Sequence, residues 1–317
     1  MVKVVVTGGA GFIGSYVSRK LSEKKYDVVV FDDFSNATGK SNLPKNIKII
    51  KKSILDVSAL KRAFKGAKIV IHMAVKPLPM SFVDPDEIVK VNDFGSYLVS
   101  KTCTELKCKL IHVSSSEAYG SAKYIPMKET HPFLPSTIYA SSKAASELYV
   151  RGFVKTDGLK AVIVRPFNSY GPHMREDDYA AAIPKFFERI SNNKPPIIHG
   201  NGNQTRDFTF VEDTADGIIL AAEKSKAVGD VFNIGQGKEI SIKKLANIMI
   251  KEYSKIENKK ISSKLIHQKY RKGDVKRHLS DITHAKKILN FKPKVNFEEG
   301  IKKYIEWKLG ENKINLK

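Results

Sequence analysis

Two short motifs contain the residue types that chemistry on a carbon–oxygen bond would need. The first runs from Gly8 to Gly14 and places glycines three residues apart, directly after the valine-rich segment 2–6. The second is Tyr139-Ala-Ser-Ser-Lys143. A tyrosine hydroxyl has a pKa of about 10, and an ammonium four residues later on one helix face can lower that pKa. Together the motifs predict hydride and proton transfer, with a dinucleotide at the glycines and the tyrosine as acid or base.

The glycine motif stands where a predicted strand gives way to a predicted helix. Residues 2–6 form a β-branched run typical of a buried parallel strand, and the apolar spacing becomes helical from residue 15 to residue 24. In this context Gly8 permits the tight turn, Gly11 lets a pyrophosphate approach the backbone, and Gly14 lets the helix pack on the strand. We therefore predict a dinucleotide-binding turn.

The expected cofactor contacts extend to the start of that helix and to the next strand. The backbone amides of Phe12 and Ile13 would face the phosphates. The predicted strand 27–31 ends in Asp32-Asp33, close to the offset of roughly 20 residues at which an acid hydrogen-bonds the adenosine ribose. Because a carboxylate repels a 2′-phosphate and no arginine follows directly, we expect NAD rather than NADP.

The order of predicted elements indicates an α/β fold with a Rossmann-type, doubly wound parallel sheet. After residue 168 glycine and proline become more frequent, and residues 192–204 and 268–280 are predicted to be loops. We expect residues 1–166 to form an NAD-binding domain that carries the catalytic residues. Residues 167–317 would form mainly a smaller α/β substrate-binding lobe, with some segments returning to the first domain. Further strands are predicted at Ile47–Ile50, Ile69–His72, Leu110–Val113 and Ala161–Val164.

Composition argues against several other functions. The chain has 55 Lys and Arg against 33 Asp and Glu, a net charge of +22, but the lysines are spread along its length without a recognised nucleic-acid module. We therefore expect solvated lysines and no nucleic-acid partner. Two cysteines, Cys103 and Cys108, fit neither a disulfide framework nor a metal site. Without a signal-peptide pattern at the start or an apolar run of about 18 residues, we expect a cytoplasmic protein with no membrane segment.

A family resemblance emerges from the segment before the tyrosine. The predicted strand at residues 110–113 leads into Ser114-Ser-Ser-Glu-Ala-Tyr-Gly120, and here the sequence resembles the extended short-chain dehydrogenase/reductase family of nucleotide-sugar epimerases and dehydratases. The resemblance covers essentially the whole chain. Further ordered matches are Thr7–Ser15, Asp32-Asp33, Leu55-Asp56-Val57, His72-Met73-Ala74, Asn92, Tyr139–Lys143, Arg165–Pro172, Gln204–Gly217 and Arg271–Asp281.

The resemblance implies a role for each matched position. It makes Tyr139 the acid/base, Lys143 its modulator and Ser115 the hydrogen-bond partner of the sugar's 4-oxygen. The implied cofactor contacts are Gly8, Gly11, Phe12, Ile13, Gly14, Asp32, Asp33, Asn36, Asp56, Val57, Met73, Ala74, Asn92, Tyr139, Lys143 and Pro166. The implied substrate contacts are Ser115, Ser116, Asn168, Arg206, Arg271 and Asp274. Arginines also suit a pyrophosphate on physical grounds, because their planar forks bind oxyanions bidentately.

The resemblance implies an NAD-dependent nucleotide-sugar 4-epimerase, with a UDP-hexose as substrate and a transient 4-keto sugar as intermediate. Glu117 leaves two alternatives open. Family epimerases usually carry small residues at the Ser116-Glu117 positions, 4,6-dehydratases Asp-Glu and UDP-glucuronate decarboxylases Ser-Glu. A carboxylate beside the ketone could remove the C5 proton. Catalytically silent dinucleotide sensors characteristically lose the tyrosine or the lysine, and this chain retains both. The resemblance also implies a homodimer, formed through predicted helices at residues 93–106 and 140–153.

Overall fold

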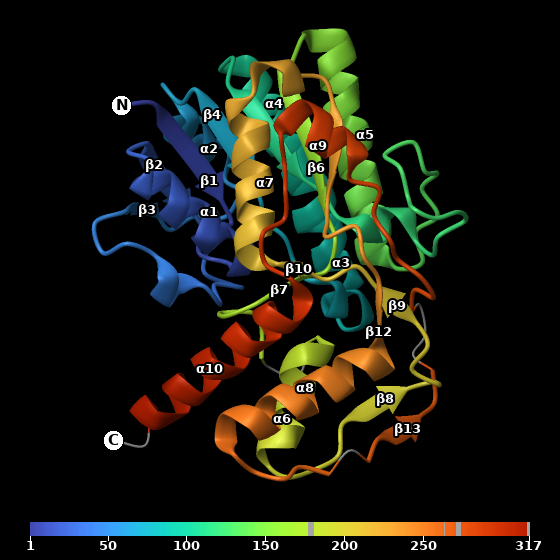
Figure 1. The fold of residues 1–317 in the computed structure, drawn as a ribbon. Coiled ribbons are helices and arrows are strands. Elements are labelled where there is room, and N and C mark those ends of the chain that lie inside the picture. The colour runs from blue at the N-terminus through green and yellow to red at the C-terminus, as the bar shows by residue number, and fades with distance from the viewer. Residues whose placement is uncertain (177–180, 263, 271–273, 316–317) are drawn as a thin grey trace.

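A computed structural model describes residues 1–176, 181–262, 264–270 and 274–315, with side chains described up to residue 311 (Figure 1). Its larger part is built on a seven-stranded sheet with the order β11-β6-β5-β4-β1-β2-β3, in which every neighbouring pair is parallel. The predicted α/β fold with a Rossmann-type sheet is therefore confirmed. The strands are β1 (Lys3–Thr7), β2 (Asp27–Phe31), β3 (Lys48–Ile50), β4 (Ile69–His72), β5 (Lys109–Val113), β6 (Ala161–Pro166) and β11 (Val231–Ile234).

Helices cover both faces of this sheet, because the strands are apolar on both sides. Val4 and Val6 point into one core, which α1 (Phe12–Glu23), α7 (Val211–Glu223) and α9 (Thr283–Leu289) close. Val5 points into the opposite core, which is closed by α2 (Val57–Phe64), α4 (Gly95–Glu105) and α5 (Ile138–Asp157). Figure 1 shows α1 and α7 in front of the sheet and α4 and α5 behind it. The sheet is thus doubly wound.

The two helices predicted at residues 93–106 and 140–153 both exist: α4 (Gly95–Glu105) lies within the first range, and α5 (Ile138–Asp157) extends beyond the second at both ends. The first is preceded by α3 (Pro85–Ile88), where Asp84 accepts a hydrogen bond of 3.0 Å from the amide of Glu87, and by a π-helical turn, η3 (Val89–Phe94). The second, α5, begins after Thr137 and ends before Gly158, which has a φ of 69°. Asp84 therefore sets the start of the helical segment before α4, and Thr137 and Gly158 set the two ends of α5.

The smaller lobe packs around its own apolar core and lies below the sheet in Figure 1. Its helices are α6 (Ala182–Ser191), α8 (Ile242–Glu257) and α10 (Phe297–Asn315). Its short strands pair as β7 (Ser169–Tyr170) with β10 (Thr209–Phe210), β8 (Ile197–His199) with β13 (Ile266–Gln268), and β9 (Thr205–Arg206) with β12 (Ile240–Ser241). The 3-10 turns found among the described residues are η1 (Lys40–Asn42), η2 (Leu78–Phe82), η4 (Ser116–Tyr119) and η5 (Ser225–Ala227).

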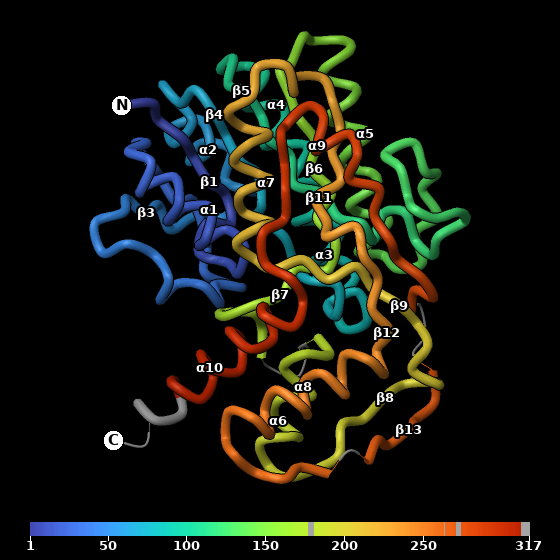
Figure 2. The backbone as a smooth tube through the Cα atoms, in the orientation of Figure 1, coloured from blue at the N-terminus to red at the C-terminus, as the bar shows by residue number. Residues whose placement is uncertain are grey.

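Of two predictions about this half of the chain, one is wrong and the other stays a prediction. The prediction that residues 192–204 are a loop is wrong, because β8 lies within them; three residues between Pro196 and Gly200 are too short to show a period. The predicted boundary at residue 166 stays a prediction. Later segments, α7, β11 and α9, return to the large sheet, and residues 120–137 loop out beside it before α5 (green in Figure 2).

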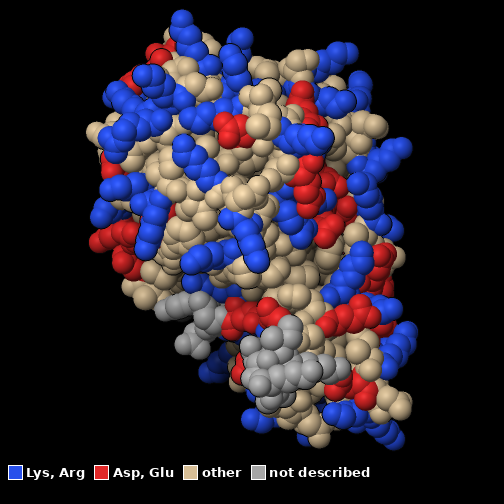
Figure 3. All heavy atoms as spheres, turned by 90° about the vertical axis from the view of Figure 1, so that its left-hand side faces the viewer, with Lys and Arg blue, Asp and Glu red and all other residues tan. Residues whose placement is uncertain are grey.

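Part of the lysine excess stabilises helix ends. Lys3 Nζ donates hydrogen bonds of 2.7 Å to the main-chain oxygens of Ala63 and Lys65, where α2 ends. Lys109 Nζ donates in the same way to Ala222, at 2.8 Å, where α7 ends. A cation there offsets the negative end of the helix dipole. Figure 3 shows many further Lys and Arg side chains on one side of the molecule, interspersed with acids.

The described residues lack two features that other kinds of function would need. None of the helices they form combines the length and hydropathy that a membrane span requires. The same residues contain no group of three or more His, Cys, Asp or Glu side chains that could hold a metal ion.

Candidate active site

A cavity of about 300 Å³ opens where β1, β2, β4, β5 and β6 end. Turns that follow parallel strands meet at this edge of the sheet, which is where open α/β sheets bind ligands. The cavity is lined by 17 of the residues that the sequence assigned to a site: Gly8, Gly11, Phe12, Ile13, Gly14, Asp32, Asp33, Asn36, Met73, Ala74, Ser115, Ser116, Glu117, Tyr139, Lys143, Pro166 and Asn168. Motifs more than a hundred residues apart therefore share one cavity.

The glycine turn forms a cradle that side chains would close. Gly8 has a φ of 69°, and a Cβ atom there would lie 2.5 Å from the main-chain nitrogen of Ala74. A Cβ atom at Gly14 would overlap the main-chain oxygen of Gly8. At Gly11 a Cβ atom would meet only the oxygens of Gly8 at 3.3 Å and Asn36 at 3.8 Å, so this side of the turn is open. The first turn of α1 faces that opening, and its amides suit a pyrophosphate.

Main-chain amides hold the acid that ends β2. Asp32 Oδ2 accepts from the amide of Ala10 at 2.9 Å, and Oδ1 accepts from the amide of Phe34 at 2.8 Å. Burial raises the pKa of Asp32, and the two amides oppose the rise. Asp33 is more exposed and accepts from the amide and hydroxyl of Ser35 at 2.9 and 2.6 Å. Both carboxylates line the cavity and so lie within reach of a ribose there.

Three buried polar atoms of the cavity lining have no hydrogen-bond partner within the described residues. They are Asn36 Oδ1, Ser114 Oγ and Asn168 Nδ2. A buried polar group without a partner costs stability, so such atoms indicate a ligand that would complete them. With the open glycine cradle, they fit a polar molecule such as NAD and its partner substrate. Sequence reasoning assigned Asn36 and Asn168 but missed Ser114.

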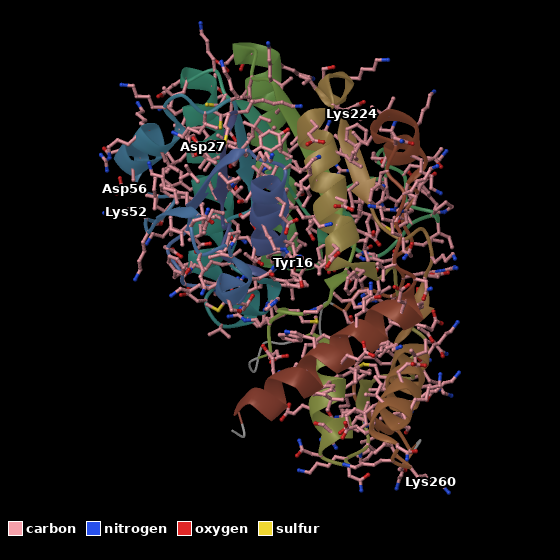
Figure 4. The ribbon with its side chains drawn as sticks, turned by 60° about the vertical axis from the view of Figure 1, so that its left-hand side comes forward. Tyr16, Asp27, Lys52, Asp56, Lys224 and Lys260 are labelled. Carbon is pink, nitrogen blue, oxygen red and sulfur yellow. The ribbon has the colours of Figure 1, made fainter. Side chains whose placement is uncertain are left out.

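Asp56 and Val57 lie outside the set of residues that line the cavity. Asp56 caps α2 by accepting from the amide of Ala59 at 2.9 Å, and its other oxygen lies 3.7 Å from Lys52 Nζ. Figure 4 shows Lys52 and Asp56 together at the edge of the molecule. Lys52 and Ile54 do line the cavity, although the sequence assigned neither. The family resemblance in this segment covered only the residues that come next, Leu55-Asp56-Val57.

Asn92 acts on the cavity through another residue. Its Oδ1 accepts from the amide of Lys76 at 2.7 Å, and its Nδ2 donates to the main-chain oxygen of Lys76 at 3.0 Å. Asn92 is buried and does not line the cavity, whereas Lys76 does. The structure thus gives Asn92 the task of holding the loop after β4, next to Met73 and Ala74.

Ser115, Tyr139 and Lys143 lie together in the cavity. Burial raises the pKa of Tyr139 to about 12; the carboxylate of Glu117 adds to the rise, and a hydrogen bond with Ser115 opposes it. Lys143 Nζ donates to the main-chain oxygen of Val113 at 2.7 Å, and burial lowers the pKa of Lys143 to about 8. The prediction of a lowered pKa for Tyr139 is therefore wrong for this state. Spacing on a helix gave no information about desolvation, which is the larger effect here.

Glu117 belongs to the same cluster. It lines the cavity with Ser116, and burial raises the pKa of its carboxyl, while the positive charge of Arg206 lowers that pKa and Asp274 raises it. A buried carboxyl group with a raised pKa beside a tyrosine is a candidate proton donor or acceptor. Glu117, the residue that leaves dehydration and decarboxylation open beside epimerisation, thus lines the same cavity as Ser115 and Tyr139.

The remaining substrate candidates lie beyond the cavity lining or outside the described residues. Arg206 donates to the main-chain oxygens of Val275 at 2.6 Å and Thr205 at 2.9 Å, and it pairs with Asp274. The structure thus brings Arg206 and Asp274 together, but neither lines the cavity. Arg271 lies outside the described residues.

Comparison with known proteins places the chain in a family. The sequence model described as GDP-mannose 4,6 dehydratase matches residues 5–304. The chain belongs to the extended short-chain dehydrogenase/reductase family of nucleotide-sugar epimerases and dehydratases. The resemblance seen in the sequence is therefore confirmed.

Members of the family differ in the reactions named for them. A human relative named dTDP-D-glucose 4,6-dehydratase is 33% identical over 96% of this chain and 89% of its own. A UDP-glucose 4-epimerase from Thermotoga maritima, solved with UDP-glucose, is 32% identical over 98% of this chain and 100% of its own, with a TM-score of 0.91. A UDP-glucuronic acid 4-epimerase from Bacillus cereus, solved with UDP-glucuronic acid and NAD, is 28% identical over 98% and 100%, with a TM-score of 0.88.

Proposed function

We propose that the protein is an NAD-dependent nucleotide-sugar 4-epimerase whose substrate is a UDP-hexose. One observation carries this proposal: Ser115, Tyr139 and Lys143 line the same cavity as the glycine turn. A sugar carbon at these side chains and a dinucleotide at the turn would therefore lie side by side. Retention of all three side chains supports an enzyme over a silent dinucleotide sensor. Related proteins that hold NAD or UDP-sugars support the choice of ligands.

In this proposal Tyr139 moves the proton of the sugar's C4 hydroxyl. Bound NAD would supply the hydride acceptor for C4 and return the same hydride to the opposite face of the ketone. As phenolate, Tyr139 takes the hydroxyl proton, which forms the C4 carbonyl, and it gives the proton back when the C4 hydroxyl is restored. Ser115 would hydrogen-bond the 4-oxygen in both states. The net reaction inverts C4 and consumes neither proton nor cofactor.

Tyr139 can act as a base only if its pKa falls well below the value of about 12 in the described state. A cation brought close to the phenolate would lower that pKa. The Lys143 ammonium, which donates to the main-chain oxygen of Val113, is such a cation in the cavity lining. We infer that Lys143 lowers the pKa of Tyr139 during the reaction, and that the same ammonium would donate to the nicotinamide ribose of NAD held at the glycine turn.

The nucleotide diphosphate would supply most of the binding energy, because the hexose must turn over between the two hydride transfers. Asn168 Nδ2, a buried donor in the cavity lining, would bind a substrate phosphate. Arg206 would bind the pyrophosphate and Asp274 the ribose, which requires the present pair to open. Arg271 is the second proposed pyrophosphate ligand.

Glu117 favours a second candidate, a 4,6-dehydratase. Its carboxylate lines the cavity together with Tyr139 and raises the pKa of the phenol, and in this second candidate it would remove the C5 proton of a 4-keto sugar. Removal of that proton opens elimination of the C6 hydroxyl as water. Ser116 stands where dehydratases usually have the aspartate that protonates the leaving hydroxyl, and a serine is a poor acid. UDP-glucuronate decarboxylation is the remaining alternative for the same pair.

Product analysis separates these reactions. Purified protein is incubated with a panel of UDP-, dTDP- and GDP-sugars, and the products are analysed by mass spectrometry and NMR. Epimerisation keeps the mass, dehydration loses water and decarboxylation loses carbon dioxide. We expect the first result with a UDP-hexose, and Glu117→Gln should keep most of that activity. Loss of water or carbon dioxide, abolished in Glu117→Gln, would overturn the epimerase proposal.

We also propose that two copies of the chain pair through α4 and α5. The apolar side chains on and beside these helices that are at least 40% exposed include Val89, Phe94, Leu148 and Tyr149. The ring of Phe94 stacks on Tyr97, and Tyr97 meets Tyr149 edge to face, so the surface is continuous across both helices. Light scattering should show a dimer of the 35.5 kDa chain, and Leu148→Lys should shift it to a monomer. A monomeric wild-type protein at micromolar concentration would contradict pairing.

A further inference from the structure

The first turn of α5 carries the proposed acid/base and needs acceptors for its free amides. Tyr139 is the second residue of this helix, and amides at such positions have no partner within the helix. Thr137, the residue before the helix, accepts from the amide of Ala140 at 3.1 Å through its hydroxyl. It leaves the amide of Tyr139 to be satisfied elsewhere.

Ser81 supplies the missing acceptor from a distant segment. Its hydroxyl oxygen accepts a hydrogen bond of 2.8 Å from the amide of Tyr139, and the two residues are 58 positions apart in the chain. Ser81 is buried, and its turn, η2, packs against α5 and α3. The N-terminus of α5 is thus capped by two residues, one local and one from the loop that follows β4.

The loop that carries Ser81 also forms the wall of the cavity. Val75 and Lys76 line the cavity immediately before η2 begins at Leu78. The side-chain amide of Asn92 holds the main chain of Lys76 through hydrogen bonds of 2.7 and 3.0 Å. One end of this short segment is therefore fixed at the cavity wall and the other at the backbone of Tyr139.

We propose that Ser81 is a positioning residue that holds the main chain of Tyr139 at a set place relative to the cavity wall. The inference rests on the proposed role of Tyr139 in proton transfer. Through η2, the wall around the cofactor and the start of the catalytic helix move as one unit. Loss of the bond would let the phenol drift from Ser115 and from the reacting carbon, and small misplacements of reacting groups are costly in rate.

The test compares three variants of the full-length, NAD-loaded protein with UDP-glucose as probe. Ser81→Ala removes the acceptor for the Tyr139 amide, whereas Ser81→Thr keeps it. Thr137→Ala is the matched control, since it removes the other acceptor of the same helix turn but not the one that holds Tyr139. Measurements are kcat and KM, the pH profile of kcat/KM, and the thermal midpoint of unfolding.

We expect Ser81→Ala to lower kcat on the order of 10- to 100-fold. The KM for UDP-glucose should change far less than kcat. The rising limb of the pH profile should move to higher pH, because the hydrogen bond with Ser115 lowers the pKa of Tyr139. Ser81→Thr should restore most of the rate. Ser81→Ala and Thr137→Ala should lower the thermal midpoint of unfolding by similar amounts. Thr137→Ala should, however, lose less kcat than Ser81→Ala and leave the pH profile unchanged.

Equal losses of kcat in Ser81→Ala and Thr137→Ala, or an unchanged pH profile in Ser81→Ala, would overturn the inference, because Ser81 would then only stabilise the helix. The Tyr139→Phe variant distinguishes a failure of the inference about Ser81 from a failure of the proposed role of Tyr139. If that variant retained full turnover, the role of Tyr139 would fail together with any positioning by Ser81. If Tyr139→Phe were inactive while Ser81→Ala were fully active, only the inference about Ser81 would fail.

Discussion

Lys143 donates its hydrogen bond to the main-chain oxygen of Val113, at 2.7 Å, although it lies one helical turn from Tyr139. Val113 is the last residue of β5, so the ammonium is held against the end of a central strand. The buried amine has a pKa lowered to about 8, and the buried phenol has a pKa raised to about 12. The spacing of one helical turn therefore does not by itself lower the pKa of the Tyr139 phenol, because burial outweighs it.

Replacing the proposed acid/base should separate catalysis from binding. Tyr139→Phe removes only the hydroxyl, so the variant should bind NAD nearly as well as the wild type. Its turnover should fall about 100-fold or more, because general acid–base catalysis typically contributes that much. Steady-state rates and calorimetric titration with NAD check both parts. Full activity in the variant would remove Tyr139 from the mechanism.

Removing the ammonium should impair both cofactor binding and rate. Lys143→Ala should raise the Kd for NAD about tenfold or more, as expected for loss of a charged hydrogen bond of about 1.5–3 kcal/mol. Since the pKa of Lys143 is about 8, its charge is present below that pH and is lost above it. The difference in NAD affinity between wild type and variant should thus narrow from pH 7 to pH 9. A difference that widens with pH would argue against a charge effect.

The acid at the end of β2 should favour NAD over NADP. A 2′-phosphate near Asp32 would meet a like charge, at a cost of about 1–4 kcal/mol for effective dielectric constants of roughly 20 to 80. The preference for NAD should therefore be about tenfold or greater, and Asp32→Ala should narrow it. Asp33→Ala is the matched control, with a smaller effect because that carboxylate is exposed. Equal calorimetric affinities for both cofactors in the wild type would mean that Asp32 does not face the ribose.

Acid should destabilise the fold through a buried histidine. His278 is fully buried, its Nε2 lies 2.8 Å from the main-chain oxygen of Gly120, and burial lowers its pKa to about 4. The unfolded chain binds a proton near pH 6.5 and the folded chain does not, so stability is lost as the pH falls through this window. From pH 7 to pH 5 the loss from this group is about 2 kcal/mol.

The matched variant is His278→Gln, which keeps a donor for Gly120 but does not titrate. Urea unfolding at pH 7 and pH 5 gives the change in the free energy of unfolding between the two pH values. This change should be about 2 kcal/mol smaller in the variant than in the wild type. His72 and His112, whose pKa values are also lowered by burial, remain in both proteins and cancel in the comparison. An identical pH dependence would mean that His278 already carries its proton in the fold.

The sequence was sufficient for six of the seven strands of the large sheet, because most of them repeat a strong signal; the edge strand β11 was not predicted. Valine-rich runs such as residues 2–6 and 27–31 are followed by turn residues and helical spacing, and that pattern depends only on near neighbours. The glycines and the Tyr139–Lys143 pair were found for the same reason. Short strands such as β8 carry too few residues for a period, so the smaller lobe could not be derived in detail.

What the sequence could not provide are contacts between distant segments. The bond of Ser81 to Tyr139 and the clamp of Asn92 on Lys76 join residues 58 and 16 positions apart through main-chain atoms, which leave no pattern of residue types. The raised pKa of Tyr139 depends on burial, which residue types close to it in the sequence do not reveal. Ser114 could have been suspected, because it directly follows β5 at the edge where the other site residues lie.

The most direct test of the central claim follows the hydrogen at C4. Purified protein is incubated with UDP-glucose that carries deuterium at C4, in ordinary water, and the product is analysed by NMR and mass spectrometry. Return of the same hydride to the opposite face predicts UDP-galactose that keeps the deuterium at C4, with no change of mass. Product that has lost water, or that has lost the deuterium from C4, would contradict a 4-epimerase.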